Sequence, residues 1–79
     1  MKIGARYKVT WLDAASAPAG WMSVEEAKKF APAKCSNTGV LLVKTKQYIV
    51  LVGGDNDNGE VSEVTAISFA WLTGVKMLR

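Results

Sequence analysis

Residues Gly39–Val52 read Gly-Val-Leu-Leu-Val-Lys-Thr-Lys-Gln-Tyr-Ile-Val-Leu-Val. Two apolar runs, Val40–Val43 and Tyr48–Val52, flank the polar segment Lys44–Gln47. This pattern predicts a β-hairpin with a short loop. Neighbouring side chains on a strand point to opposite faces, so both faces of this hairpin are apolar. Both faces therefore need cover, which the rest of the chain or a second copy of it must supply.

The composition is that of a small globular protein. The chain has 79 residues, of which 49% are hydrophobic and 22% are charged, and this predicts one domain spanning residues 1–79. No apolar run is long enough to cross a membrane, and the charges near the start do not fit a signal peptide. Cys35 is the only cysteine, so no internal disulfide can form. We therefore expect a cytoplasmic protein without membrane association.

The segments before the hairpin predict a strand and a short helix. Polar and apolar residues alternate over Arg6–Leu12, as in a half-buried strand. Ser23-Val24-Glu25-Glu26 matches a helix capping box, which predicts a helix over Val24–Ala31 that ends before Pro32. We expect one face of this helix to lie against the sheet. Lys34–Thr38 is expected to be extended, and Gly39 to make a bend or bulge.

The segments after the hairpin predict a loop and two more strands. Gly53–Gly59 has the composition of an exposed loop. Val61–Trp71 has features of both a strand and a helix, and its β-branched residues favour a strand over Glu60–Ser68. Ala70–Thr73 is expected to be a tight turn or one turn of 3₁₀ helix, and Val75–Leu78 a final strand.

These elements together indicate a mainly β fold. Five short strands that curl on themselves predict a small, partly open, five-stranded barrel of the SH3-like or Sm-like type. The one short α-helix lies in its first long connection. Such an analogy concerns architecture and does not determine function.

The residue types argue against catalysis. The chain has no histidine, which removes the commonest general base and His-ligated zinc. One thiol, Cys35, cannot build a structural zinc site. Asp55 and Asp57 faintly resemble a calcium loop, but Gly59 and Ala66 stand where further oxygen ligands belong. We therefore expect no enzymatic activity, no catalytic residue, no metal and no cofactor.

A binding role is the remaining expectation. The formal net charge is +3 and the sequence pI is about 9.2, which favours anionic partners. Exposed cations and aromatic rings at the junctions of loops and strands suit a stacked, charged ligand. The candidate ligand-binding residues are Arg6, Lys8, Trp21, Lys44, Lys46 and Trp71. The alternative reading is that the tryptophans pack in the core and that the cations form a solvated surface.

Several short motifs resemble those of a group of small uncharacterised phage and prophage proteins. They are Trp11-Leu12-Asp13, Gly20-Trp21, Ser23 with Glu26-Ala27, Gly39, and Tyr48-Ile49-Val50-Leu51. The group often has a proline where this chain has Ser68. The resemblance implies a phage accessory protein, made in the host bacterial cytoplasm, that binds and neutralises a host component. Some such proteins sequester nucleotide signals of anti-phage defence. No binding residue is carried over from the group.

Three functions are compatible with these observations. The first is a homo-oligomer that sequesters a small anionic ligand, such as a nucleotide signal, at a subunit junction as an anti-defence protein. The second is a nucleic-acid-binding β-barrel, whose binding would weaken steeply with salt. The third is an interaction module that docks on a host protein through a strand edge or an apolar patch.

Overall fold

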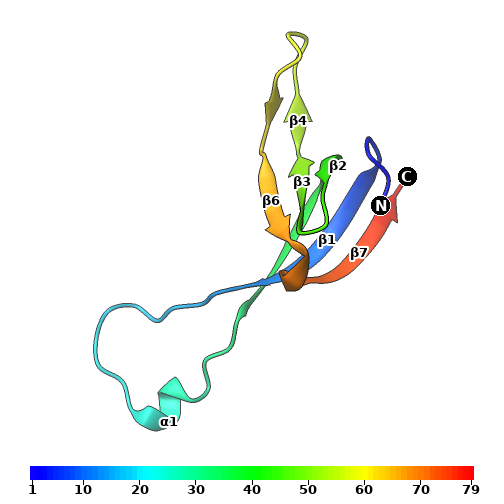
Figure 1. The fold of residues 1–79 in the computed structure, drawn as a ribbon. Coiled ribbons are helices and arrows are strands. Elements are labelled where there is room, and N and C mark those ends of the chain that lie inside the picture. The colour runs from blue at the N-terminus through cyan, green and yellow to red at the C-terminus, as the bar shows by residue number, and fades with distance from the viewer.

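One curled antiparallel sheet dominates the computed structural model, which describes all of residues 1–79. Its strands follow the order β6-β3-β2-β1-β7 across the sheet (Figure 1). They are β1 (Arg6–Asp13), β2 (Ala33–Lys44), β3 (Tyr48–Val52), β6 (Thr65–Ser68) and β7 (Leu72–Leu78). The prediction of a mainly β fold is confirmed, as is the antiparallel pairing of the β2–β3 hairpin.

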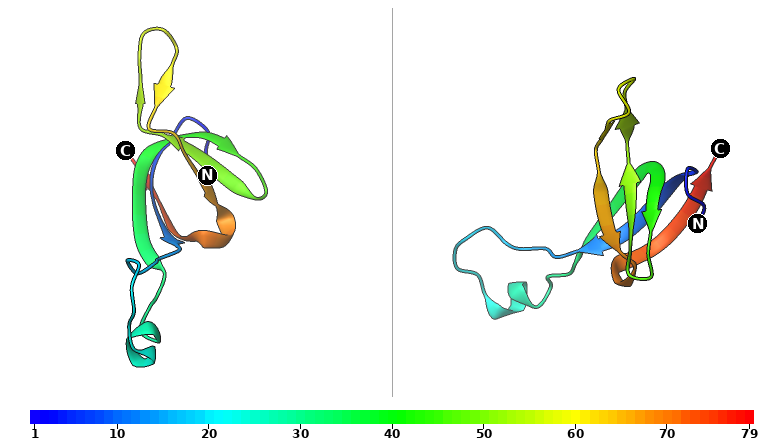
Figure 2. Two further views of the ribbon diagram at one scale, coloured as in Figure 1. Left: turned by 90° about the vertical axis from the view of Figure 1, so that its left-hand side faces the viewer. Right: turned by 45° about the horizontal axis from the view of Figure 1, so that its top comes forward.

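The sheet curls on itself but does not close into a barrel. β6 and β7 form its two edges and are not paired with each other. The 3₁₀ helix η1 (Phe69–Trp71) connects these edges (Figure 2). Ser68 caps η1, since its Oγ accepts a hydrogen bond from the Ala70 N–H at 3.3 Å. The predicted 3₁₀ turn is therefore present, and β7 begins at Leu72 rather than at Val75.

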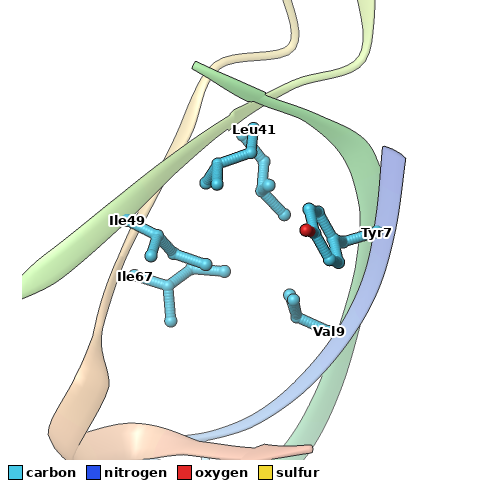
Figure 3. Packing of buried hydrophobic residues seen from close by; sticks show 6 residues of the cluster. Tyr7, Val9, Leu41, Ile49 and Ile67 are labelled. Carbon is cyan, nitrogen blue, oxygen red and sulfur yellow. The ribbon is translucent and has the colours of Figure 1, made fainter. Parts of the chain in front are cut away.

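The core lies inside the curl (Figure 3). Alternation along β1 turns Tyr7 and Val9 inward, where both are buried. The buried aliphatic residues that complete the cluster are Leu41, Ile49, Leu51 and Ile67. Each of the strands β1, β2, β3 and β6 therefore contributes to one small core.

β2 passes very close to β3 at Gly39. A Cβ at this position would lie 2.7 Å from the Val52 carbonyl oxygen, so the approach requires glycine. The predicted bulge does not fall here but three residues further along. The pairing with β3 shifts by one residue between Leu41 and Val43, which leaves Leu42 as the extra residue. Leu41 is fully buried, whereas Leu42 is 46% exposed.

The helix α1 (Val24–Ala27) is shorter than predicted. Its cap is as expected, because Ser23 Oγ accepts a hydrogen bond from the Glu26 N–H at 3.1 Å. The N–H groups of Lys29 and Phe30 bond to carbonyls only three residues back, which tightens and ends the helix. The expectation of packing against the sheet is wrong, since α1 has no buried residue. A short helix without a packed face lacks the tertiary contacts that would stabilise further turns.

The predicted strand over Glu60–Ser68 is interrupted. Glu63 has a positive φ of 53°, which a strand does not tolerate. It separates β6 from a second, two-stranded sheet of β4 (Gly54–Asp55) and β5 (Val61–Ser62). The turn of this hairpin is held by Asn56, whose Oδ1 accepts hydrogen bonds from the N–H groups of Asn58 and Glu60. The strand reading of this segment is nevertheless the correct one.

Two segments project from opposite ends of the sheet (Figures 1 and 2). We call residues 14–32 the arm and residues 53–63 the acidic hairpin. Because of them the radius of gyration is 16.2 Å, whereas a compact domain of this length has about 12 Å. Neither helical segment is long enough to cross a lipid bilayer.

The small core makes stability sensitive to Ile49, which is fully buried. We expect Ile49→Ala to lower the free energy of unfolding by about 2–5 kcal/mol, because it leaves a cavity. Ile3→Ala is the matched control, since Ile3 is 56% exposed, and it should cost less than about 0.5 kcal/mol. Urea denaturation measures both. Equal losses would contradict the placement of the core.

Candidate functional site

The outer surface of β1, β2 and β7 carries the largest set of cations on the sheet. Because Tyr7 and Val9 point into the core, Arg6 and Lys8 point outward. Strand pairing then sets their neighbours, since directly opposed residues share a face. We call this surface the basic face, and its polar residues are Arg6, Lys8, Thr10, Lys34, Ser36, Thr38 and Lys76.

Lys8 and Lys76 oppose each other across β1 and β7. Directly opposed residues hold their Cβ atoms about 4.5–5.5 Å apart, and like charges at such positions repel. On its other side, Lys8 opposes Thr38 of β2. The centre of the basic face is therefore a lysine pair with a hydroxyl beside it.

No carboxylate lies on the basic face to offset these charges. Four of the seven carboxylates belong to the acidic hairpin and two to α1. Asp13 ends β1, and its Oδ1 accepts a hydrogen bond from the Ala14 N–H at 2.8 Å. The only ion pair joins Lys28 Nζ to Glu25 Oε1 at 3.6 Å, in the arm. The lysine pair is thus uncompensated within the chain, and an anion bound there would lower its energy.

A shallow groove of about 600 Å³ begins at Thr10, two residues along β1 from Lys8, and neither lysine of the pair lines it. Its lining residues are Thr10, Trp11, Leu12, Lys34, Cys35, Ser36 and Thr73. Three hydroxyls and one ammonium group can thus donate hydrogen bonds to an oxyanion. Thr73 Oγ1 lies 3.1 Å from Thr10 Oγ1. The volume falls within the range of about 300–1,000 Å³ that is usual for small-molecule sites.

Trp11 forms the aromatic part of this groove. Its ring packs against the core, and its Nε1 donates a hydrogen bond to Asn37 Oδ1 at 2.7 Å. Such a bond fixes the indole in one orientation. Trp11 has the inward parity of Tyr7 and Val9, so its ring lies on the core side of β1, whereas Thr10, Lys34 and Ser36 lie on the outer side.

The structure brings together only part of the predicted site. Arg6 and Lys8 lie on the basic face, as their alternation implies. Trp71 is half exposed and lines a neighbouring groove of about 360 Å³, which shares Leu12 and Thr73 with the first. Trp21 is fully exposed in the arm, away from the sheet (Figure 1).

The two turn lysines occupy a different end of the sheet. Lys44 ends β2, and Lys46 lies in the turn between β2 and β3. Thr45 stabilises this turn, since its Oγ1 accepts a hydrogen bond from the Tyr48 N–H at 3.0 Å. The turn reaches η1, where the Gln47 carbonyl accepts a hydrogen bond from the Phe69 N–H. Both lysines are exposed, but neither belongs to the basic face.

Lys34 and Lys76 were missed by the sequence argument. Each lies on a strand whose alternation could have placed it outward. Their position beside β1 depends on the strand order and register, which the local pattern does not contain. No three His, Cys, Asp or Glu side chains lie close enough together to bind a metal ion.

The lysine pair should cost stability in the absence of a ligand. We expect Lys76→Glu to raise the free energy of unfolding by about 0.2–1 kcal/mol, because it replaces repulsion with attraction to Lys8. The gain should shrink as salt is added. Lys46→Glu, in the exposed turn, is the matched control and should change stability less. Chemical denaturation at low and high salt measures this effect, and a salt-independent loss in Lys76→Glu would contradict the pairing.

Comparisons with models of known protein families, with curated proteins and with solved structures give no match.

Proposed function

We propose that this protein is a non-enzymatic binding protein for a small phosphate-bearing anion such as a nucleotide. The observation that carries the proposal is the lysine pair Lys8–Lys76, which lies on a face without carboxylates. Charge-assisted hydrogen bonds to phosphate are stronger than neutral ones. The hydroxyls of the adjoining groove extend the same donor surface.

Phosphate and base would occupy different parts of this surface. The phosphate groups lie over Lys8 and Lys76, with Arg6 beside them. The sugar and base extend along the groove toward Ser36 and Lys34. An open groove binds by contact and leaves the ligand intact, which suits a protein that sequesters a ligand.

Two resemblances, one to a fold and one to a group of proteins, support the wider biological role in this proposal. A strand order with a 3₁₀ turn before the last strand supports an SH3-like barrel. The short motifs shared with small phage proteins support an accessory protein that works in the host bacterial cytoplasm. In this reading the protein acts as a homo-oligomer and removes a nucleotide signal of anti-phage defence.

Nucleic-acid binding is a second candidate function. Arg6 and Lys8 lie on one face of β1, and Lys76 opposes Lys8 on β7. Lys34 lies on the same face of β2, further along the sheet, opposite Leu12. A row of cations can follow a phosphate backbone. The difference from a nucleotide site is that affinity would rise with ligand length and fall steeply with salt.

Ligand-induced thermal stabilisation tests both candidates. The panel contains cyclic and linear nucleotides, inorganic phosphate, and a single-stranded oligonucleotide at several salt concentrations. We expect a nucleotide to raise the melting temperature and Lys8→Ala/Lys76→Ala to weaken its affinity about tenfold or more, since two charged donors are lost.

Lys28→Ala/Lys29→Ala is the matched control, because it removes two exposed lysines from the arm and leaves the basic face intact. This control should bind the nucleotide with the same affinity as the unaltered chain. Stabilisation by the oligonucleotide alone would select the second candidate. No stabilisation by any anion at low salt would refute both.

A further inference from the structure

The arm presents large apolar side chains that nothing in the chain covers. Trp21 is 104% exposed, Val24 is 69% exposed and Phe30 is 50% exposed. Every residue from 18 to 34 is exposed. The four-residue helix α1 has no buried residue, so the chain itself supplies no packing for this helix. Contiguous exposed apolar surface of this kind usually marks an interface.

The total exposed area indicates how large the missing contact is. The accessible surface is 6199 Å², whereas a compact monomer of 8.5 kDa exposes only about 4,700 Å². The excess of about 1,500 Å² per chain falls within the range that obligate homodimers bury, about 1,000–2,500 Å² per partner. A second copy of the chain is thus an occupant of the right size.

The chain also contains an apolar groove that can accept the arm. It has a volume of about 300 Å³ and lies at the base of the acidic hairpin. Its apolar lining residues are Val40, Leu42, Val52 and Val61. Leu42 and Val61 are 46% and 44% exposed. The groove is therefore concave, apolar and large enough for one ring.

Charge complementarity supports the same pairing. Asp55 lines the groove, and the acidic hairpin has four carboxylates and no lysine or arginine. In the arm, Lys28 and Lys29 directly precede Phe30. The arm carries Glu25 and Glu26 as well, and Lys28 Nζ lies 3.6 Å from Glu25 Oε1, so Lys29 is the lysine of the arm that is free to face the hairpin carboxylates.

The arm cannot reach the groove of its own chain. The arm and the acidic hairpin project from opposite ends of the sheet in every view (Figures 1 and 2), and the longest extent of the molecule is 52 Å. Contact between them therefore requires two molecules. A two-fold arrangement satisfies both arms and both grooves at once.

We propose that the arm of one copy docks in the Val40–Leu42–Val52–Val61 groove of a second copy, and that the second arm docks reciprocally in the first. Trp21, the most exposed ring of the arm, fills the groove, and Lys29 faces the acidic hairpin. This inference rests on the self-association included in the proposed function and identifies the surfaces that form it.

Sedimentation velocity of the full chain is the first test. The expected species has twice the chain mass of 8.5 kDa. Trp21→Asp removes the docked ring from both arms of the dimer, so it should weaken self-association by more than the roughly 30-fold effect of losing one interface hot spot. It should leave the circular dichroism spectrum unchanged, because Trp21 makes no contact with the sheet. Ile3→Asp is the matched control, an exposed apolar residue outside both surfaces, and should associate normally.

A mixing experiment tests the pairing itself. Val61→Asp alters the groove, and should by itself also give monomers. An equimolar mixture of Trp21→Asp and Val61→Asp chains keeps one intact arm and one intact groove, so heterodimers should form. A monomeric unaltered chain, a dimer unaffected by Trp21→Asp, or a mixture that stays monomeric would each overturn the proposal. A monomer that still binds nucleotide would overturn arm docking and leave anion binding standing.

Discussion

The structure depends on the position of β1 between β2 and β7. Pairing on both sides fixes which way each β1 residue points. The inward residues Tyr7 and Val9 supply the part of the core that the β2–β3 hairpin cannot supply for itself. The same pairing gathers Lys8 and Lys76 on the outer surface, although 67 positions separate them in the chain. Residues of the core and of the candidate site thus lie on opposite faces of the same strand, β1.

The local pattern was sufficient for the elements that hydrogen-bond to near neighbours. The β2–β3 hairpin, the Ser23 cap and the 3₁₀ turn each depend on a few adjacent residues. The hairpin and the cap occur where they were predicted, and the 3₁₀ turn covers Phe69–Trp71 instead of Ala70–Thr73. The length of α1 depends instead on packing, because a short helix needs a buried face to persist. No such face was available, so the predicted helix over Val24–Ala31 ended at Ala27.

The candidate site was harder to predict because it depends on register. Alternation correctly placed Arg6 and Lys8 outward, but nothing near them in the chain indicates Lys76. Trp21 and Trp71 share a residue type and a position at the end of a loop, yet they lie in different parts of the molecule. Their separation follows from the long arm, whose direction is set by how β1 and β2 continue beyond the sheet (Figure 2).

The two faces of the apolar β2–β3 hairpin differ in how far the rest of the chain buries them. Leu41, Ile49 and Leu51 on the inner face are buried within the chain. On the outer side Leu42 and Val43 remain partly exposed, so the chain covers only one face fully. Alternation places Leu42 on the face opposite to Leu41, in the small groove, and the bulge then pairs Val43 with Val50 instead of Ile49, which turns Val43 to the outer side as well.

The distribution of charge decides how anion binding and self-association can coexist. If the acidic hairpin of one copy lay on the basic face of another, its carboxylates would compete with an anionic ligand for Lys8 and Lys76. The arm offers the hairpin another cation, Lys29, which has no ion pair within the arm. Docking of the arm on the hairpin therefore leaves the basic face open to its ligand.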